Sequence, residues 1–340
     1  MTSALCSRDI SVVIQGPTFN GQVNIAQEAI GSVLKYLPEA EVILSTHDDE
    51  PRIDCDEVIV VRAKSSRHFT DVNGNRNNVN KLISSVMCGL ERVSREYCIK
   101  LRTDHLLTSD AIVERIRTLA SNDTPAALFT RRIAVSNLFL RNPCKIPYLF
   151  HLTDTLQFGR TEDLRKLWDI GPLPDDFIFL PGGPRTNPIG TFQGYTSFRL
   201  LPEQAIFLRF AQRNGLNVDL EHISHTSYRL FNAWEDLLVE NFELYDWQNL
   251  GVAPPKRFLS APYAPTSLMT ELDLQTLRTE RTSSERALRY ADVLINKYLL
   301  CWFHRHWLVS VGSLVLFSLS SRFAMTIRDL YRRVSGAGRL

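Results

Sequence analysis

The stretch Ile10-Ser-Val-Val-Ile-Gln-Gly-Pro17 decides how the rest of the chain is interpreted. Its first half is rich in β-branched residues, as is typical of a buried strand, and Gln15-Gly16-Pro17 ends that strand in a turn. Apolar residues at helical spacing follow until Pro38, which ends a helix. The segment therefore predicts a strand, a turn and a helix in succession, and this is how an α/β fold begins.

Strands and helices continue to alternate after this unit. Further strands are predicted at 41–45, 58–61, 97–101 and 155–159, and helices at 79–90, after Ser109, after Thr161 and from Pro202 to Asn214. Such alternation predicts an α/β fold with a mostly parallel sheet flanked by helices. Right-handed crossovers place the carboxyl ends of the strands along one edge, where these folds bind ligands. Between the last two helices, residues 171–202 are rich in Pro and Gly and predict a long ordered loop.

Composition restricts the class of protein. The 340 residues are 44% hydrophobic and 22% charged, as in a globular protein with a sizeable core, and the net charge of +2 gives no reason to expect nucleic acid as a partner. Six scattered cysteines without a C-x-x-C pair favour a reducing compartment and no structural zinc. No apolar signal segment precedes the first strand, so we expect a cytoplasmic protein. Dinucleotide-binding, P-loop, nucleophile-elbow and H-E-x-x-H motifs are missing from the sequence.

The best single candidate for chemistry is Asp104, which ends Lys100-Leu-Arg-Thr-Asp104 directly after a predicted buried strand. A carboxylate at this edge can hold a divalent ion, Mn²⁺ or Mg²⁺, which neutralises a diphosphate leaving group. Alternatively, it caps a turn at the end of the strand. Arg102 can bind phosphate through its planar fork or form a surface ion pair.

Other polar residues stand at predicted helix starts. Asn75 and Arg76 would form an anion site there, or Asn75 would only cap the helix. Glu203, in the first turn of its helix, is a candidate general base, although the helix dipole alone would favour a Glu at this position. Asp154 is a second candidate for the base. His222 and His225 are candidate metal ligands together with Asp104, or else ordinary polar groups with internal partners.

The order and spacing of several stretches resemble the WavE lipopolysaccharide-synthesis family. They are Ile10–Pro17, Asn75-Arg76 with the helix to Leu90, Lys100–Asp104, Phe150–Gly159, Pro202-Glu203-Gln204, Asn241-Phe242 and Leu250-Gly251. Together they run over roughly residues 10–257.

The resemblance implies a GT-A-like, nucleotide-sugar-binding catalytic domain over residues 1–260, followed by a C-terminal helical segment over 261–340. It implies a bacterial, hexosyltransferase-like enzyme that moves a sugar from a nucleoside diphosphate sugar to a lipopolysaccharide or related glycan or glycolipid acceptor. Such enzymes usually carry an Asp-x-Asp motif after the fourth strand, and here only its second carboxylate is present, in Arg102-Thr103-Asp104. The nucleotide would be bound by Gln15, Gly16, Pro17, Asn75, Arg76, Arg102 and Asp104, and Glu203 would lie on the acceptor side.

Two alternatives stay open beside the glycosyltransferase. A nucleotidyltransferase of sugar metabolism would use a similar sheet, but it normally needs a basic Gly-rich loop after the first strand. This chain has no Lys or Arg between Gln15 and Val23. The other alternative is a non-catalytic glycan-binding or scaffold protein.

The C-terminal segment contains fifteen uncharged residues, Trp307–Ser321, flanked by arginines such as Arg305 and Arg322. A helix needs about 20 apolar residues to span a bilayer, so this stretch is too short. Trp302, Phe303 and Trp307 instead predict an interfacial anchor on the cytoplasmic face of the inner membrane, aided by the arginines. The alternative is a helix that packs on the catalytic domain or on a second subunit.

Overall fold

The computed structural model describes residues 5–53, 55–121, 125–186, 195–259, 265–303 and 305–335. In these residues the central sheet has seven strands, in the order β12-β8-β9-β6-β1-β2-β3. They are β1 (Ile10–Gln15), β2 (Glu41–His47), β3 (Ile59–Ala63), β6 (Tyr97–Arg102), β8 (Ile133–Ser136), β9 (Leu156–Arg160) and β12 (Phe242–Tyr245). The predicted α/β class and mostly parallel sheet are confirmed.

One strand of the sheet runs against the others. Strand β9 pairs antiparallel with both β6 and β8, whereas the other neighbouring strands are parallel. The expectation that every strand ends at one edge is therefore wrong for β9, whose amino end lies at that edge. Because of this reversal, Asp154, which precedes β9, lies beside Arg102, which ends β6.

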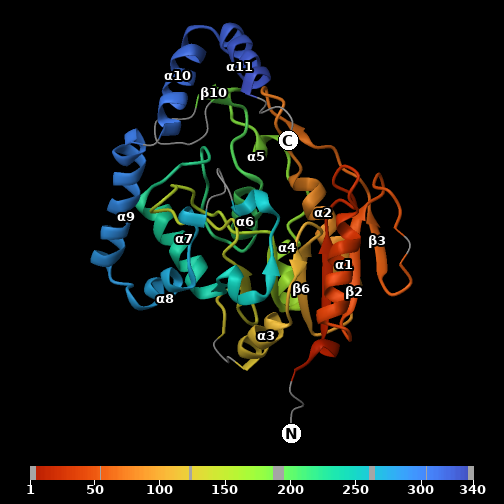
Figure 1. Ribbon diagram of the computed structural model, residues 1–340. Coiled ribbons are helices and arrows are strands. Elements are labelled where there is room, and N and C mark those ends of the chain that lie inside the picture. The colour runs from red at the N-terminus through yellow and green to blue at the C-terminus, as the bar shows by residue number, and fades with distance from the viewer. Residues whose placement is uncertain are drawn as a thin grey trace.

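Helices cover both faces of the sheet (Figure 1). On one face, α1 (Ile25–Tyr36) and α3 (Ala111–Ser121) pack against side chains such as Val12 and Ile14. On the other, Val13 faces α2 (Val79–Arg92), and the same core includes α4 (Thr161–Trp168), α6 (Pro202–Arg213) and α7 (Tyr228–Asn241). Strand β1 is buried along its whole length, as expected of a strand covered on both sides.

The remaining elements are short or lie near the C-terminus. Two-residue strands form the pairs β4 (Phe69–Thr70) with β5 (Arg76–Asn77), β7 (Leu106–Leu107) with β13 (Val252–Ala253), and β10 (Arg185–Thr186) with β11 (Tyr195–Thr196). The last helices are α8 (Glu271–Thr279), α9 (Ser283–Tyr298), α10 (Arg305–Leu319) and α11 (Ser321–Ser335). The predicted helical C-terminal segment is thus confirmed.

Several sequence predictions can be compared with these bounds. The strands predicted at 10–14, 41–45, 58–61, 97–101 and 155–159 exist, and α6 begins at Pro202 as expected. Thr161 does not cap α4: it is the first helical residue, and its hydroxyl donates to the Arg95 carbonyl at 2.8 Å. The predicted loop 171–202 also contains the short helix α5 (Asp175–Ile178), and its residues 187–194 lie outside the described residues.

The core continues past residue 260. Leu274 of α8 and Val293 of α9 are buried in the same core as α7, and α8 also contacts β12. The division into 1–260 and 261–340 stays a prediction. Helices α10 and α11 lie beyond the carboxyl edge of the sheet, near β10 (Figure 1). Of the helices described here, none has the length and apolar character needed to cross a membrane.

Candidate functional site

The loop after β1 meets the end of β6 at the carboxyl edge. Gln15 and Arg102 are paired across the two strands, and the Thr103 N–H donates to the Gln15 carbonyl at 3.0 Å. Gly16 has φ = 144°, and a Cβ there would lie 2.5 Å from Thr103 Oγ1. Glycine is therefore required for this close approach. The Gln15 side chain donates to Ser85 Oγ at 2.8 Å, whereas Pro17 is exposed.

Asp104 lies within a group of cationic and imidazole donors. Its Oδ1 accepts hydrogen bonds from Arg102 Nε at 3.0 Å and from His105 Nδ1 at 2.7 Å. Its Oδ2 accepts from Arg102 Nη2 at 3.1 Å and from Arg257 Nη2. Although burial opposes ionisation, the His105 hydrogen bond and the Arg102 charge hold the pKa of Asp104 well below its usual range. Asp104 is therefore an ionised carboxylate.

These contacts bear on the predicted divalent ion. An ionised carboxylate offers about four lone-pair sites. Each oxygen of Asp104 already accepts two hydrogen bonds, so in this arrangement the residue does not fit a metal ion. The divalent ion stays a prediction.

Asp154 approaches the same group from the amino end of β9. Its Oδ2 lies 3.6 Å from Arg102 Nη1 and 3.9 Å from Lys100 Nζ, and Lys100 also donates to the Asp154 carbonyl. Burial lowers the pKa of Lys100 to about 8. Although burial opposes ionisation, the charges of Lys100 and Arg102 lower the pKa of Asp154. An ionised, ion-paired Asp154 is a weak base, and it orients the two cations.

Glu203 lies in the first turn of α6, close to Asp154. Burial raises the pKa of Glu203 to about 8, and the Asp154 carboxylate adds to the rise. Its Oε2 lies 3.8 Å from His151 Nε2. Burial lowers the pKa of His151 to about 3, so the imidazole is neutral and does not compensate the Glu203 charge. Glu203 is therefore the stronger base of the two predicted carboxylates.

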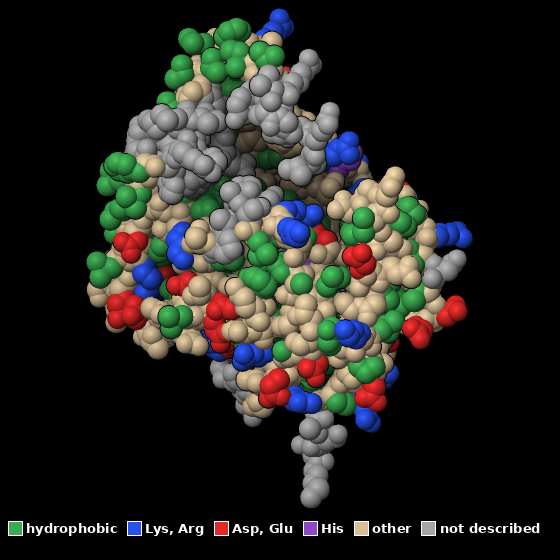
Figure 2. All heavy atoms as spheres, in the orientation of Figure 1, with side chains coloured by type: hydrophobic (Ala, Val, Ile, Leu, Met, Phe, Trp, Pro, Cys, Tyr) green, Lys and Arg blue, Asp and Glu red, His purple; other side chains and the backbone are tan. Residues whose placement is uncertain are grey.

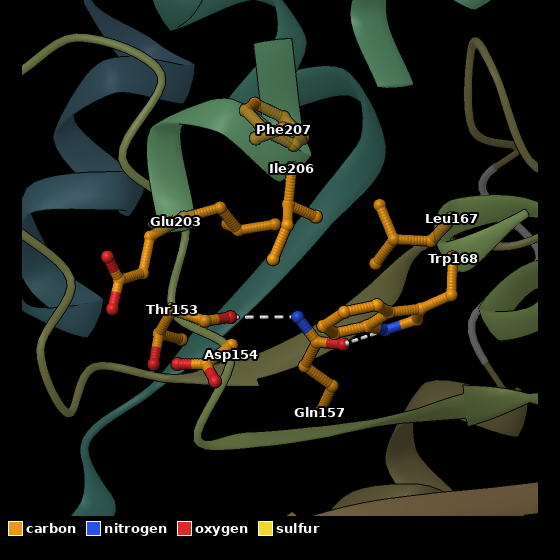
Figure 3. Close-up of a pocket in the computed structure, with 9 residues that line it drawn as sticks. Thr153, Asp154, Gln157, Leu167, Trp168, Glu203, Ile206 and Phe207 are labelled. Atoms are coloured by element: carbon orange, nitrogen blue, oxygen red, sulfur yellow. Dashed lines mark hydrogen bonds between the residues drawn. The ribbon is translucent and has the colours of Figure 1, made fainter. Parts of the chain in front are cut away.

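A small pocket connects the two carboxylates with an apolar wall (Figure 3). It is lined by Leu152, Thr153, Asp154, Gln157, Leu167, Trp168, Glu203, Ile206 and Phe207. In Figure 3 the carboxylates of Asp154 and Glu203 extend to the same side, away from Leu167 and Trp168. Trp168 Nε1 donates to Gln157 Oε1 at 2.7 Å, and Gln157 Nε2 donates to the Thr153 carbonyl at 2.8 Å. These hydrogen bonds fix the backbone that carries Asp154.

The segment leading to Asp154 stores backbone strain. Phe139 and Phe150 have φ = 64° and 55°, and these are the positive values found at non-glycine residues of the described chain. Such conformations cost on the order of 1–3 kcal/mol each and gather at functional sites. The Phe139 ring packs 5.1 Å from the ring of His151. The strain therefore lies around the residues that face Glu203.

The predicted anion site at Asn75 and Arg76 lies elsewhere. Both residues belong to the β4–β5 hairpin, and α2 begins later, at Val79, so they do not form its N-terminus. The Asn75 side chain donates to Asp71 Oδ2 at 3.2 Å and stabilises the turn, while Arg76 is exposed. Their role in binding stays a prediction, and their predicted place at a helix start is wrong.

The predicted metal ligands also do not meet. Within the described part of the chain, no three His, Cys, Asp or Glu side chains form a group that could hold a metal ion. Asp104, His222 and His225 therefore do not come together as one three-ligand group, and their role as metal ligands stays a prediction. His225 Nδ1 accepts from the Glu221 N–H at 3.1 Å, and His222 Nδ1 lies 3.3 Å from Ser224 Oγ. Both histidines have internal partners in the loop between α6 and α7.

Sequence reasoning missed four members of the site, namely Lys100, His105, His151 and Arg257. One signal was available for Lys100, because a lysine inside an otherwise apolar strand must find a buried partner. His151 stands three residues before Asp154 in a stretch already selected. Nothing in the sequence connects Arg257 with Asp104, because the contact depends on tertiary folding.

Fold and site together define an α/β protein with two arginines on one carboxylate, and with the largely buried carboxylates of Asp154 and Glu203 nearby, at the carboxyl edge of a mostly parallel sheet. Residues 10–303 match the sequence model of the WavE lipopolysaccharide synthesis family, and the chain belongs to that family. The match continues past residue 257, where the resemblance seen in the sequence ended. Membership connects the chain with lipopolysaccharide synthesis.

Other comparisons give more distant likenesses. No curated protein sequence matches the chain. Among solved structures, the chain is similar to 4-diphosphocytidyl-2C-methyl-D-erythritol synthase from Anaerococcus prevotii, with 12% sequence identity and a TM-score of 0.31. The matched region covers 48% of this chain and 76% of the synthase chain. The bifunctional IspDF from Campylobacter jejuni is also 12% identical, covers 49% and 45% respectively, and has a TM-score of 0.30.

Proposed function

We propose that this protein is a glycosyltransferase that moves a sugar from a nucleoside diphosphate sugar to a hydroxyl of a lipopolysaccharide or related glycan acceptor. The observation that carries the proposal is the Glu203 carboxylate, which is only 12% exposed and has a pKa raised to about 8, beside a cationic edge formed by Arg102 and Arg257. A base and a phosphate-binding edge are the two parts that glycosyl transfer from a diphosphate needs.

In the proposed reaction, the acceptor oxygen forms a bond to the anomeric carbon of the donor sugar. The proton of that hydroxyl passes to Glu203, and the electron pair of the broken carbon–oxygen bond stays on the diphosphate. Asp154 keeps Arg102 and Lys100 in place and does not take the proton, because its own carboxylate is paired with both cations. The apolar wall of the pocket limits competition from water.

A donor screen on the purified chain tests the proposal. Calorimetry against nucleoside diphosphates and their sugar conjugates, followed by transfer assays with the ligands that bind, would identify the nucleotide and the sugar together. We expect at least one nucleoside diphosphate to bind. Preference for a nucleoside triphosphate would favour the nucleotidyltransferase alternative, and binding of glycans alone would favour the non-catalytic one.

We further propose that α10 and α11 hold the enzyme at the cytoplasmic face of the inner membrane, where a lipid-linked acceptor would be available. Large apolar side chains on and just before these helices are unusually exposed, including Phe303, which precedes α10, at 87%, Leu319 at 77% and Leu330 at 62%. Figure 2 shows hydrophobic side chains gathered over α10 and α11. Contiguous exposed apolar surface of this kind marks a contact with membrane or protein.

The two faces of this helix pair differ. On the inner face, Ala324 is buried, the rings of Tyr195 and Phe317 stack 4.2 Å apart, and Arg328 donates to Asn73. On the outer face, Phe323, Ile327 and Leu330 recur at helical spacing and are exposed. The inner face of the helix pair packs against the α/β domain, and we propose that the exposed outer face contacts the lipid bilayer. The side chains of Trp302, Arg305 and Trp307 lie outside the described residues.

A further inference from the structure

Arg257 reaches Asp104 from a segment 153 residues further along the chain. It lies in the short 3-10 helix η3 (Lys256–Leu259), which follows β13. Strand β13 pairs with β7, whose first residue, Leu106, comes two positions after Asp104. The pairing of β13 with β7 therefore places the Arg257 guanidinium group against Asp104, the carboxylate that Arg102 also contacts.

The guanidinium groups of both arginines pack against the same buried aromatic ring, that of Phe258. Phe258 is 7% exposed, and its ring centroid lies 5.8 Å from the Arg102 guanidinium carbon and 5.2 Å from that of Arg257. Cations near an aromatic face are attracted by its quadrupole. Phe258 also packs 5.6 Å from the His105 ring. The two guanidinium groups are thus held in place before any ligand arrives.

Cationic groups outnumber the carboxylate at the exposed end of this site. Asp104 contacts the guanidinium groups of both Arg102 and Arg257, whereas Asp154 and Lys100 form a buried pair. The Arg257 side chain is 48% exposed, so it can meet a ligand that enters from solvent. Figure 2 shows a hollow beneath α10 and α11, with Lys or Arg side chains near its lower rim.

We propose that Arg102 and Arg257, held by Asp104, bind the donor diphosphate directly and neutralise its charge without a divalent ion. The inference rests on the proposed glycosyl transfer. Asp104 then positions the arginines and does not ligate a metal, because its oxygens are occupied by their hydrogen bonds. The planar fork of arginine matches phosphate oxygens, and the charge that develops on the leaving diphosphate would be stabilised where it forms.

Calorimetry with uridine, guanosine, adenosine and cytidine diphosphates tests the inference, once in EDTA and once with Mn²⁺. We expect the preferred nucleotide to bind the wild-type chain equally well in both buffers. Arg257→Ala should weaken binding about 10- to 100-fold, because it removes charge-assisted hydrogen bonds. Arg257→Lys keeps the charge without the fork, so it should bind with intermediate affinity, and it serves as the second variant if Arg257→Ala fails to fold.

Arg117→Ala is the matched control. Arg117 has a similar exposure of 43% and pairs with Glu114 at 3.0 Å on α3, and its replacement should leave nucleotide binding unchanged. Binding that requires Mn²⁺, or an Arg257→Ala variant that binds as tightly as wild type, would overturn the arginine site and leave the proposed transfer standing. If the wild-type chain binds no nucleoside diphosphate in either buffer, the proposed function fails and this inference fails with it.

Discussion

The Nε2 atom of His151 lies 3.8 Å from Oε2 of Glu203, and neither imidazole nitrogen has a hydrogen-bond partner among the described residues. At neutral pH this imidazole carries no charge, because burial lowers its pKa to about 3. Glu203 therefore has a neutral neighbour on one side and the Asp154 carboxylate on the other. Burial, with the Asp154 carboxylate adding to its effect, raises the pKa of Glu203 to about 8, which suits the general-base role that we propose for it.

Replacing Glu203 by Gln should remove the base and keep the shape of the pocket. We expect turnover to fall about 100- to 10,000-fold, while binding of the donor nucleotide stays near the wild-type value. Steady-state kinetics together with calorimetry separate the two effects. Glu162→Gln is the control, because Glu162 also lies in the first turn of a helix but is 57% exposed. Full activity in Glu203→Gln would exclude this residue as the base.

The rate should rise with pH in the wild-type enzyme. A base with a pKa of about 8 is mostly protonated at pH 6, so kcat should increase through an inflection near pH 8. Glu203→Gln should lose this inflection. A flat profile in the wild type between pH 6 and 9 would contradict the assignment.

Stability should change with pH in the opposite sense. Burial raises the pKa of Glu203 to about 8 in the folded state, so the folded protein binds more protons than the unfolded chain between the ordinary carboxyl pKa and pH 8. The contribution of Glu203 to stability is complete at low pH and is lost as the pH rises toward 8. Urea unfolding across this window should show wild type losing stability relative to Glu203→Gln.

Lys100→Met tests the buried pair with Asp154. Lys100 is fully buried, and its removal leaves the Asp154 carboxylate with less compensating charge. We expect a loss of about 3–5 kcal/mol in the free energy of unfolding. Combining Lys100→Met with Asp154→Asn should cost less than the sum of the two single variants, because the second change removes the uncompensated charge. Additive costs in a urea-unfolding cycle would mean that the two groups do not interact.

Gly16→Ala should disturb the edge where the loop after β1 meets Thr103. The new Cβ would lie 2.5 Å from Thr103 Oγ1, at a φ of 144° that favours glycine. We expect a loss of about 1–3 kcal/mol in stability, measured by thermal unfolding. Adding Thr103→Ala should recover only part of it, because it relieves the contact and leaves the backbone strain. An unchanged melting temperature would show that the close approach is not required.

Phe323→Glu together with Ile327→Glu tests the outer face of α11. Flotation with vesicles of phosphatidylglycerol should carry the wild-type chain upward, and the double variant should stay at the bottom, because charged side chains oppose burial in the lipid. Salt should weaken the wild-type binding if arginines assist it. Leu272→Glu is the control, since Leu272 is 69% exposed but lies on α8. Wild-type protein that does not float, or a control that detaches equally, would count against the anchor.

The sequence by itself determined the alternation of strands and helices, and it selected Arg102, Asp104, Asp154 and Glu203 as candidates at the carboxyl edge, the predicted ligand side. These features are local, since periodicity and the residue after a strand can be read within one element. The contact between Arg102 and Asp154 depends on β9 running antiparallel to β6. This direction brings Asp154, which precedes β9, next to Arg102, which ends β6. No local pattern encodes that reversal.

Only the tertiary structure decided how charge is distributed at the site. Arg257 reaches Asp104 through the pairing of β7 with β13, and this pairing joins segments that are remote in sequence. Likewise, the pKa values of Glu203 and Lys100 depend on burial by helices from elsewhere in the chain. Desolvation and charge pairing act through space, so the residue types alone could not say which carboxylate has the raised pKa and which one holds the arginines.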